Sequence, residues 1–599
     1  MKKILCAAIA LFGALSSTGA AGSVTVNQSG SGNFTSIQAA IDSGASLITI
    51  TDSGHYVENL EIGGQDTGGP AVTLTSNKTG TNLPVITPSA IKFYVNSARN
   101  SQGAGFGLFA NNSVVSNLIL EGQPDLGQMA PMTVVANNVL IENCLFRIAA
   151  GTTNAYPAAR PLLFIGQQGD GIGNATPGGQ DSNGTIIRNC EFTGLAPDAN
   201  PVEPTADNRG YLGKKTDPPP VGTGQASGYV RIDMSTVAGE DVFITFEGCY
   251  FHHDLDYGIF PTDSRADGGS LNINIKKCRF DANGKFFYRG RGVNVNVESS
   301  IFTRAGQTRA TDTENSAVAI NVNAGHIPSG TVSNCVFVNC GSASYQQAYF
   351  GGVNIDSGDF MTVDRCTFVD CVSGVGAGSG NSGDLFVSRS IFHQIGDNVP
   401  PSVDNDRVTL TNGSPDLVNG LYPAWTNGLA NFVNKYSAVF NRWRWNNDSK
   451  IIINTCLVGS IDTEDTNSWD DALLNGVTGC RLFAGYDTNF FGANTVTRGT
   501  PIFVTTDPNA PNAFQLAGSS PGQGLGANLA PVLEPKLTIS RAGNQVNISW
   551  TPPPIWMKGS LKSTPSLTGP VWTPVVGVSN NSVVVPIGSA NRFFAIIND

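Results

Sequence analysis

The repeating unit of this 599-residue chain is clearest at Val332-Ser333-Asn334-Cys335-Val336-Phe337. It consists of an aliphatic residue or Phe, two mostly polar residues, Cys or Ser, any residue, and then Phe. The Cys or Ser positions of its eight copies are Cys144, Cys190, Cys249, Cys278, Ser300, Cys335, Cys366 and Ser390. Successive copies lie 46, 59, 29, 22, 35, 31 and 24 residues apart. The shorter intervals are typical of one coil of a parallel β-solenoid, and the two longest hold either an extra coil or long excursions.

Within each copy the Cys and the Phe stand two positions apart, so their side chains point to the same side of a strand. The alternation breaks one residue before the Cys, where a sharp bend is expected. Asn143, Asn189 and Asn334 occupy this position, and Asn tolerates the left-handed backbone that such a corner requires. Coils stacked about 4.8 Å apart would place Cys over Cys and Phe over Phe in one continuous core. The cysteines are therefore expected to be small buried ladder residues.

This pattern, with Cys335, Cys340, Cys366 and Cys371, resembles the right-handed parallel β-helix of the pectin-lyase-like superfamily. That superfamily includes lyases, hydrolases, esterases, epimerases, adhesins and phage spikes, so the resemblance implies a fold rather than an activity. The Asp-Phe-Ile-Phe-Gly motif of its methylesterases is absent, and of its polygalacturonase motifs only Asp470-Asp471 and Gly325-His326 occur, in the wrong order. No family-level catalytic residue is therefore carried over.

The two ends of the predicted β-helix resemble the same superfamily. Ile37-Gln38-Ala39-Ala40-Ile41 predicts a helix that caps the first coil, and Gly54-His55-Tyr56 with Glu58 resembles the strand motif that follows it. Pro501-Ile502-Phe503-Val504 and Phe514-Gln515-Leu516 resemble closing coils. The fold class is thus all-β: a right-handed parallel β-helix over residues 23–530, with an N-terminal cap and long loops.

Residues 531–599 differ in sequence pattern from the β-helix region and predict a small C-terminal β-sandwich. Short alternating strands are expected around Leu537, Val546 and Val583. The segment resembles a module found on secreted bacterial proteins, which implies a role in cell-surface attachment or in export. Three tryptophans of this segment, Trp550, Trp556 and Trp572, could stack on sugars. Packing in a small core is favoured for at least two of them.

Residues 1–22 predict a signal peptide. Lys2 and Lys3 precede the apolar run 4–15, and small residues follow near the expected cleavage site. The alternative is a buried N-terminal helix. The apolar run is too short to span a bilayer, so no transmembrane segment is predicted and the protein is expected to be secreted or at the cell surface. The net charge of -11 and the absence of a basic stripe disfavour nucleic-acid binding.

Two disulfides are candidates in an exported protein. Cys340 and Cys371 each follow a repeat cysteine by five residues and so align one coil apart. Cys456 and Cys480, outside the repeat, form the second candidate pair.

A polar group after Phe251 is the nearest approach to a reactive cluster. Aligning Cys249 with Cys278 sets His252 beside Asp281, Asp254 beside Asn283 and Asp256 beside Lys285. Arginines follow, with Arg304 on the coil after. The candidate catalytic residues are His252, Asp254, Asp256, Asp281, Lys285, Arg289 and Arg291.

Two mechanisms could use this cluster. An inverting glycosidase would pair Asp254 with Asp281 as acid and base across the scissile bond. A uronate lyase would use Arg289 or Arg291 to neutralise the substrate carboxylate and Lys285 as the base. The structural alternative, which the pattern favours over both, is a solvated corner with ordinary ion pairs.

Two further signals concern binding. Trp443 and Trp445 are candidate substrate-binding residues, because they share one face of an extended segment, although packing against the last coils fits equally. The acidic stretch 462–471 offers oxygen ligands for Ca²⁺ but lacks regular spacing, so no metal site is assigned and no cofactor is expected beyond that Ca²⁺ option. The sequence predicts a secreted protein that binds or processes an extracellular polysaccharide in a lateral groove. The alternative is a non-catalytic cell-surface or matrix adhesin or scaffold.

Overall fold

The computed structural model describes most of the chain in segments. They are residues 22–64, 68–90, 104–123, 130–151, 160–167, 182–198, 228–234, 240–254, 257–265, 268–283, 286–305, 316–323, 325–341, 351–371, 374–377, 383–395, 440–442, 451–459, 480–481, 496–510, 512–529, 537–550, 559–568, 570–578, 582–587 and 592–598. The predicted signal peptide falls outside them, except for Gly22.

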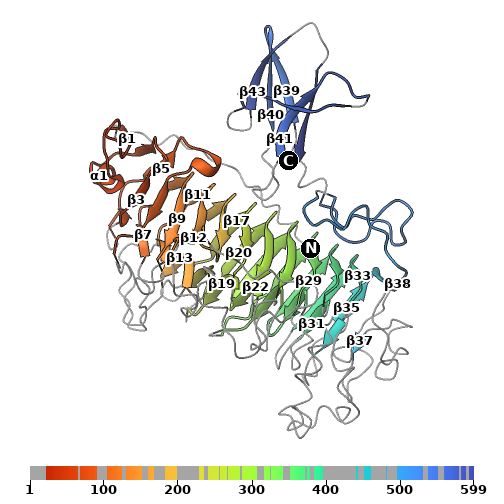
Figure 1. The fold of residues 1–599 in the computed structure, drawn as a ribbon. Helices are drawn as coiled ribbons and strands as arrows, with labels where there is room; N and C mark the ends of the chain where they lie inside the picture. Colours follow the sequence, from red (N-terminus) through yellow and green to blue (C-terminus); the bar gives the residue numbers. More distant parts are fainter. Residues whose placement is uncertain are drawn as a thin grey trace.

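Three long parallel sheets form a β-helix, and the chain passes through sheets A, B and C in turn on each coil. Sheet A contains β1 (Ser23–Val26), β2 (Leu47–Ile50), β5 (Thr73–Ser76), β8 (Val114–Ser116), β11 (Leu140–Glu142), β14 (Thr185–Arg188), β17 (Val242–Glu247), β20 (Leu271–Lys276), β23 (Val293–Glu298), β26 (Gly330–Ser333), β29 (Phe360–Asp364), β32 (Asp384–Ser388) and β35 (Ile451–Asn454). Figure 1 shows the coils stacked in a row, starting beside the short helix α1 (Ile37–Asp42).

Sheets B and C complete each coil. Sheet B contains β3 (His55–Val57), β6 (Val85–Thr87), β9 (Ile119–Gly122), β12 (Leu145–Ile148), β15 (Glu191–Thr193), β18 (Tyr250–His252), β21 (Arg279–Asn283), β24 (Ile301–Ala305), β27 (Val336–Val338), β30 (Thr367–Val369), β33 (Ile391–His393), β36 (Cys456–Val458) and β38 (Val496–Arg498). Sheet C contains β4 (Leu60–Ile62), β7 (Ala104–Leu108), β10 (Ala130–Val134), β13 (Arg160–Gln167), β16 (Gly228–Met234), β19 (Tyr257–Asp263), β22 (Phe286–Arg291), β25 (Val318–Asn321), β28 (Val353–Ile355), β31 (Val375–Ala377), β34 (Phe440–Arg442) and β37 (Cys480–Arg481). A 3-10 turn, η1 (Gly80–Asn82), precedes β6.

The two longest repeat intervals are single coils with excursions. Leu140 on β11 pairs directly with Ile186 on β14, and Ile186 pairs with Thr245 on β17. No extra coil is inserted between these strands. Each interval instead contributes one sheet C strand, β13 or β16.

The predicted corner between sheets A and B is confirmed. Asn143, Asn189 and Asn334 have φ angles of 53°, 50° and 52°. Lys277 and Arg365 adopt the same left-handed backbone, with φ values of 53° and 52°. The corner therefore does not require Asn. The parallel hydrogen bonds on either side hold the left-handed backbone even where the residue type disfavours that conformation.

The phenylalanines of the repeat form the predicted stack inside sheet B. Neighbouring ring centroids lie 4.7 to 4.9 Å apart, and interplanar angles stay between 4° and 9°. The stack comprises Phe146, Phe192, Phe251, Phe280, Phe302, Phe337, Phe368 and Phe392. All eight are buried, so the stack runs along the core from one coil to the next.

The nine cysteines whose side chains the structure describes are buried, as predicted for the repeat, and neither candidate disulfide is formed. Cys340 and Cys371 are free thiols, and so is Cys456. In-register parallel strands hold facing Cβ atoms at about the 4.8 Å strand spacing, beyond the 3.5 to 4.5 Å that a disulfide needs. Cys456 lies on sheet B whereas Cys480 lies on sheet C, so their strands are not neighbours.

The predicted capping helix is confirmed, and its neighbour Glu58 explains the motif that follows it. The Glu58 carboxylate accepts hydrogen bonds from Ile37 N at 3.0 Å and from Gln38 N at 3.1 Å. It also accepts one from Ser36 Oγ at 2.7 Å. These contacts satisfy backbone donors at the helix start, while Ile37 and Ala40 cover the first coil.

The segment that resembles closing coils runs instead along the outward face of sheet B. We call residues 499–510 and 512–529 the closing segment. Phe514 packs in an apolar cluster with Ile301 and Val336, which point outward from sheet B. Ala527 N donates to Thr367 Oγ1 at 2.9 Å. The closing segment therefore covers outward apolar residues of β24, β27 and β30.

The C-terminal β-sandwich is also present. One antiparallel sheet has the order β39 (Leu537–Ala542), β40 (Gln545–Trp550) and β43 (Ser582–Pro586), and the other has the order β42 (Thr573–Pro574), β41 (Gly559–Thr564) and β44 (Phe593–Asn598). Trp550 is buried in its core with Ile548 and Leu561. Trp572 is half-buried, and Trp556 lies outside the described residues.

Replacing Tyr288 with Phe is expected to raise the melting temperature. Tyr288 is fully buried in the core, and its hydroxyl has no hydrogen-bond partner in the described part of the chain. Removing an unsatisfied buried hydroxyl should stabilise the fold by about 1 kcal/mol. Thermal unfolding followed by circular dichroism measures this change. A lower melting temperature for the variant would contradict the assignment, and Tyr257→Phe on the same sheet is the control.

Candidate functional site

The candidate site residues are divided between two faces of the β-helix. His252 and Asp281 pair in register on sheet B, as predicted. Arg289 and Arg291 lie on β22 of sheet C. Asp254 is buried just after β18. The remaining candidates, Asp256, Lys285, Trp443 and Trp445, lie outside the described side chains, as does the acidic stretch 462–471.

On sheet B, His252 joins three neighbouring side chains. Its Nε2 lies 3.0 Å from Glu191 Oε1, and its Nδ1 lies 2.8 Å from His253 Nδ1. The His252 ring also stacks on Tyr250, with centroids 4.3 Å apart. Because a carboxylate only accepts hydrogen bonds, His252 Nε2 donates to Glu191, and a neutral His252 then accepts from His253.

Asp281 is held as an anion by the following coil. Its carboxylate accepts hydrogen bonds from Arg304 Nε at 2.8 Å, Arg304 Nη2 at 2.7 Å and Thr303 Oγ1 at 2.6 Å. Burial raises the pKa of Asp281, but the hydrogen bonds and charge of Arg304, with Thr303, outweigh it, so the pKa is lowered from its ordinary value. This carboxylate is arranged as an ion-pair partner, and its predicted catalytic role stays a prediction.

The outward face of sheet C carries two register columns of polar and aromatic side chains. The first column contains Thr133, Phe164, Arg231, Phe260, Arg289, Ala319, Asn354 and Gly376. The second contains Asp233, Thr262, Arg291 and Asn321, with Asp356 following. The charged members gather on the middle coils, from β16 to the end of β28.

Three arginines dominate the middle of this face. Arg231 Nε lies 2.9 Å from both carboxylate oxygens of Asp233. The guanidinium carbons of Arg231 and Arg291 lie 4.6 and 5.3 Å from the ring centroid of Phe260. Phe260 therefore holds two guanidinium groups of different coils against one ring through cation–π contacts.

Asp233 retains its proton to a higher pH than an ordinary aspartate. It is 4% exposed, and burial raises its pKa, although the charge and hydrogen bonds of Arg231 oppose the shift. On the outward face of sheet C, the carboxyl group of Asp233 thus lies directly beside the guanidinium group of Arg231.

A second polar group lies three to four coils beyond Asp233. Asn321 Nδ2 donates to Asp356 Oδ2 at 2.5 Å, and Ser357 Oγ donates to Asn321 Oδ1 at 2.5 Å. Arg289 Nη2 lies 3.9 Å from the same Asp356 oxygen. This network links the two columns of the face.

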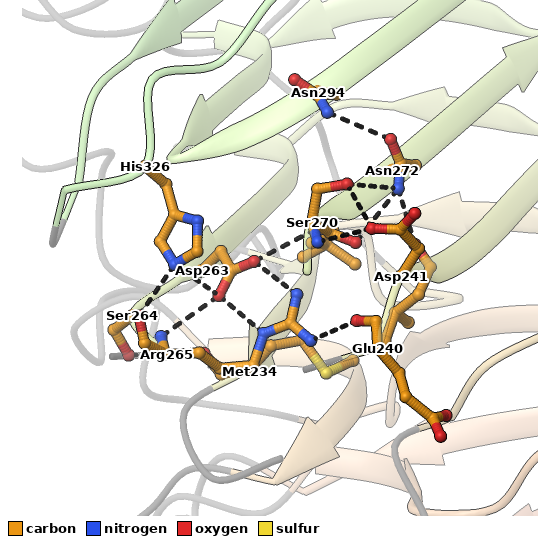
Figure 2. Close-up of polar contacts among 12 residues, drawn as sticks. Met234, Glu240, Asp241, Asp263, Ser264, Arg265, Ser270, Asn272, Asn294 and His326 are labelled. Carbon is orange, nitrogen blue, oxygen red and sulfur yellow. Dashed lines mark hydrogen bonds and ion pairs between the residues drawn. The ribbon is translucent and has the colours of Figure 1, made fainter. Parts of the chain in front are cut away.

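A buried ion pair fixes the end of β19, next to this face. Figure 2 shows Asp263 and Arg265 at the corner between sheets C and A, with His326 approaching from another coil. Asp263 Oδ1 accepts from Arg265 Nε at 2.9 Å, and Oδ2 accepts from Arg265 Nη2 at 2.7 Å. Arg265 Nη1 donates to the Glu240 carbonyl oxygen at 2.8 Å. The corner therefore ties three coils together at the strand that carries Phe260.

Sequence reasoning missed most of the sheet C face. Arg231, Asp233 and Phe260 lie on strands without the Cys-x-Phe repeat. The alternation in Tyr229-Val230-Arg231-Ile232-Asp233-Met234 was the available signal, because Val230 and Ile232 point into the core. Asn354 sits between two core residues in the same way.

The described residues contain no group of three or more His, Cys, Asp or Glu side chains arranged to hold a metal ion. No helix in the described segments is long and apolar enough to cross a membrane.

Comparisons with known proteins yield distant structural likenesses. No protein-family model and no curated protein sequence matches the chain. Tailspike protein 3 of bacteriophage CBA120 is similar with a TM-score of 0.38 and 12% identity, and the match covers 78% of this chain and 58% of the tailspike. A mannuronic acid specific family 6 polysaccharide lyase from human gut microbiota has a TM-score of 0.24 and 9% identity, over 73% of this chain and 86% of the lyase. The GH136 lacto-N-biosidase of Eubacterium ramulus has a TM-score of 0.29 and 10% identity, over 72% of this chain and 67% of the enzyme.

Proposed function

We propose that this protein binds an acidic polysaccharide along the outward face of sheet C. The observation that carries the proposal is the set of three arginines on one face of a chain of net charge -11: Arg231 lies on β16, and Arg289 and Arg291 lie on β22, two coils further along. Within the described columns of this face, the arginines outnumber the carboxylates Asp233 and Asp356. The face thus concentrates positive charge in a protein that is acidic as a whole.

Arginine suits the recognition of uronate carboxylates. Its planar guanidinium can donate two parallel hydrogen bonds to one carboxylate and remains charged at all ordinary pH values. Phe260 restricts the guanidinium groups of Arg231 and Arg291, so less conformational freedom is lost when an anion binds.

The solenoid itself favours a polymer as the ligand. Successive coils present corresponding side chains about every 4.8 Å along one axis. An extended chain with regularly spaced carboxylates can therefore contact several coils at once, and weak contacts add along its length.

Arg291→Gln is expected to weaken binding of polygalacturonate or alginate by at least about tenfold, because one charge-assisted contact is lost. Isothermal titration calorimetry at low and high salt measures the affinity and its salt dependence. The matched control is Arg389→Gln, which removes the same charge from an exposed Asp364 pair at the corner between sheets A and B. Equal losses in the two variants, or no binding by the natural sequence, would contradict the proposal.

Analysis of the products after incubation with the same polysaccharides separates binding from cleavage. Asp233 and Asp356 are four coil spacings apart, about 19 Å, which exceeds the roughly 6.5 to 9.5 Å of an inverting glycosidase pair. A uronate lyase needs positive charge on the substrate carboxylate, which Arg289 or Arg291 would supply. Unsaturated products would identify a lyase, new reducing ends without them a hydrolase, and neither a non-catalytic binding protein such as an adhesin.

Export and attachment are further parts of this proposal. The predicted signal peptide would deliver the chain to the outside of the cell, where acidic polysaccharides occur. The C-terminal β-sandwich would then attach the β-helix to the cell surface.

A further inference from the structure

We infer that the outward face of sheet A binds an uncharged polysaccharide, a ligand class distinct from the acidic polymer proposed for sheet C. Two register columns of side chains cross this face from β17 to β29, and none of their members is charged. The first column contains Phe243, Asn272, Asn294, Ser329 and Phe360, and the second contains Thr245, Asn274, Asn296, Thr331 and Thr362. We call them the uncharged columns.

The side chains of the uncharged columns point outward and reach solvent. Their chain neighbours Ile244, Ile273 and Val295 belong to the central core, and side chains alternate along a strand. Phe243 is 47% exposed and Phe360 is 37% exposed. The polar members between them are half-buried, so a ligand that lies on this face can contact each strand from β17 to β29.

Exposed phenylalanines mark the two ends of this stretch. Phe243 lies on β17 and Phe360 on β29, and the exposed Phe386 lies one coil beyond, opposite Thr362. Phe243 and Phe360 are four coil spacings apart, about 19 Å along the solenoid. The face of an aromatic ring is negative and attracts the C–H groups of a sugar ring, so each end offers a stacking position.

Asparagine amides occupy the middle of the stretch. Asn294 Nδ2 donates to Asn272 Oδ1 at 3.1 Å, a contact that Figure 2 shows, and Asn296 Nδ2 lies 3.5 Å from Asn274 Oδ1. These contacts hold the amides in register. Among the described residues, neither Asn274 Nδ2 nor Asn296 Oδ1 has a hydrogen-bond partner. One donor and one acceptor therefore remain for a ligand, and sugar hydroxyls can satisfy both, since each hydroxyl donates and accepts.

On the described part of sheet A, charged side chains border the uncharged columns. Glu247, Lys276 and Glu298 form the next column toward the corner with sheet B, and their signs alternate from coil to coil. Asp241 lies at the opposite border, and Asp384 follows Phe360 on β32. A polyanion finds no excess of positive charge here, whereas a neutral chain makes contacts that do not depend on charge.

The layout favours a polysaccharide over a second copy of this chain. A protein interface concentrates its aromatic anchors at a desolvated centre. Here Phe243 and Phe360 lie at the ends, and the centre is polar. Sugar rings follow one another along a polymer as coils follow one another along the solenoid. One polysaccharide can therefore stack at both ends and hydrogen-bond between them, and its weak contacts add.

Affinity electrophoresis of the full chain tests this inference. The gels contain soluble mixed-linkage β-glucan or galactomannan, which are uncharged polysaccharides, or poly(vinyl alcohol), which has hydroxyls but no sugar rings. We expect at least one polysaccharide to retard the protein and poly(vinyl alcohol) to leave its migration unchanged. Equal retardation by poly(vinyl alcohol) would contradict recognition of sugar rings.

Phe243→Ala and Phe360→Ala are each expected to weaken polysaccharide binding by about tenfold, because a stacking position is lost. Phe360→Leu should weaken it similarly, since it keeps an apolar side chain and removes the ring. The matched control is Phe593→Ala, which removes an exposed ring from the C-terminal β-sandwich. Melting temperatures should change little, because all these positions are exposed.

Unchanged polysaccharide binding by Phe243→Ala and Phe360→Ala, or an equal loss in Phe593→Ala, would overturn the inference. Sedimentation velocity supplies a further check, because self-association that these two variants abolish would assign the face to a second copy instead. The proposed function is tested separately: Arg291→Gln should leave binding of the neutral polymer unchanged, and Phe360→Ala should leave polygalacturonate binding unchanged. Failure of both neutral polysaccharides to retard the natural sequence would refute the inference and leave the proposed function in place.

Discussion

Asp263→Ala is expected to lower the free energy of unfolding by about 3 to 5 kcal/mol, because it leaves the Arg265 guanidinium charged and buried without its carboxylate. The Asp263 and Arg265 side chains are 0% and 1% exposed. Asp263 Oδ2 also accepts a hydrogen bond from Leu271 N at 3.1 Å, which ties it to the start of β20. The change therefore removes both a charge partner and a backbone acceptor.

Urea denaturation and hydrogen exchange measure this effect. Loss of protection should be greatest in β17, β19 and β20, which meet at this corner. Asp241→Ala is the control, since Asp241 lies in the same close-up but is exposed, and among the described residues Ser270 alone donates hydrogen bonds to its side chain. Similar losses in the two variants would refute the assigned role of the buried pair.

Phe280→Ala is the second change with a large expected effect, again about 3 to 5 kcal/mol. Phe280 is fully buried between Phe251 and Phe302, with ring centroids 4.7 and 4.8 Å away. Its removal leaves a cavity that neighbouring strands cannot close, because their backbones are fixed by parallel hydrogen bonds.

Phe243→Ala provides the matched control for Phe280. Phe243 is 47% exposed on the outward face of sheet A, so its truncation should change stability little. Urea denaturation of the two variants gives the comparison. A smaller loss for Phe280→Ala than for Phe243→Ala would contradict the role of the stack.

The fold was predictable because its repeat combines a corner with a core position. Cys and Phe mark the passage from sheet A to sheet B on coil after coil, which fixes the coil register across intervals as different as 22 and 59 residues. The same signal could not show that Cys340 and Cys371 remain unpaired, because alignment of two coils does not orient their Cβ atoms toward each other.

The candidate site was only partly predictable. The repeat placed His252 beside Asp281, since both follow the Phe of a copy at the same distance. It could not place Arg231 or Asn354, because sheet C begins after connections of variable length and its outward residues share no motif. Their common face exists only once the coils are stacked.

The reactivity of the buried free cysteines can report where the β-helix opens. Cys144, Cys249, Cys278, Cys335 and Cys366 lie in the core on different coils. Burial also raises the pKa of the Cys278 and Cys366 thiols, so the intact coils contain little of the reactive thiolate. Alkylation of each cysteine therefore requires that its own coil separate from its neighbours. The order in which an alkylating reagent modifies them, read by peptide mass, would report where along the molecule unwinding begins and how far it travels.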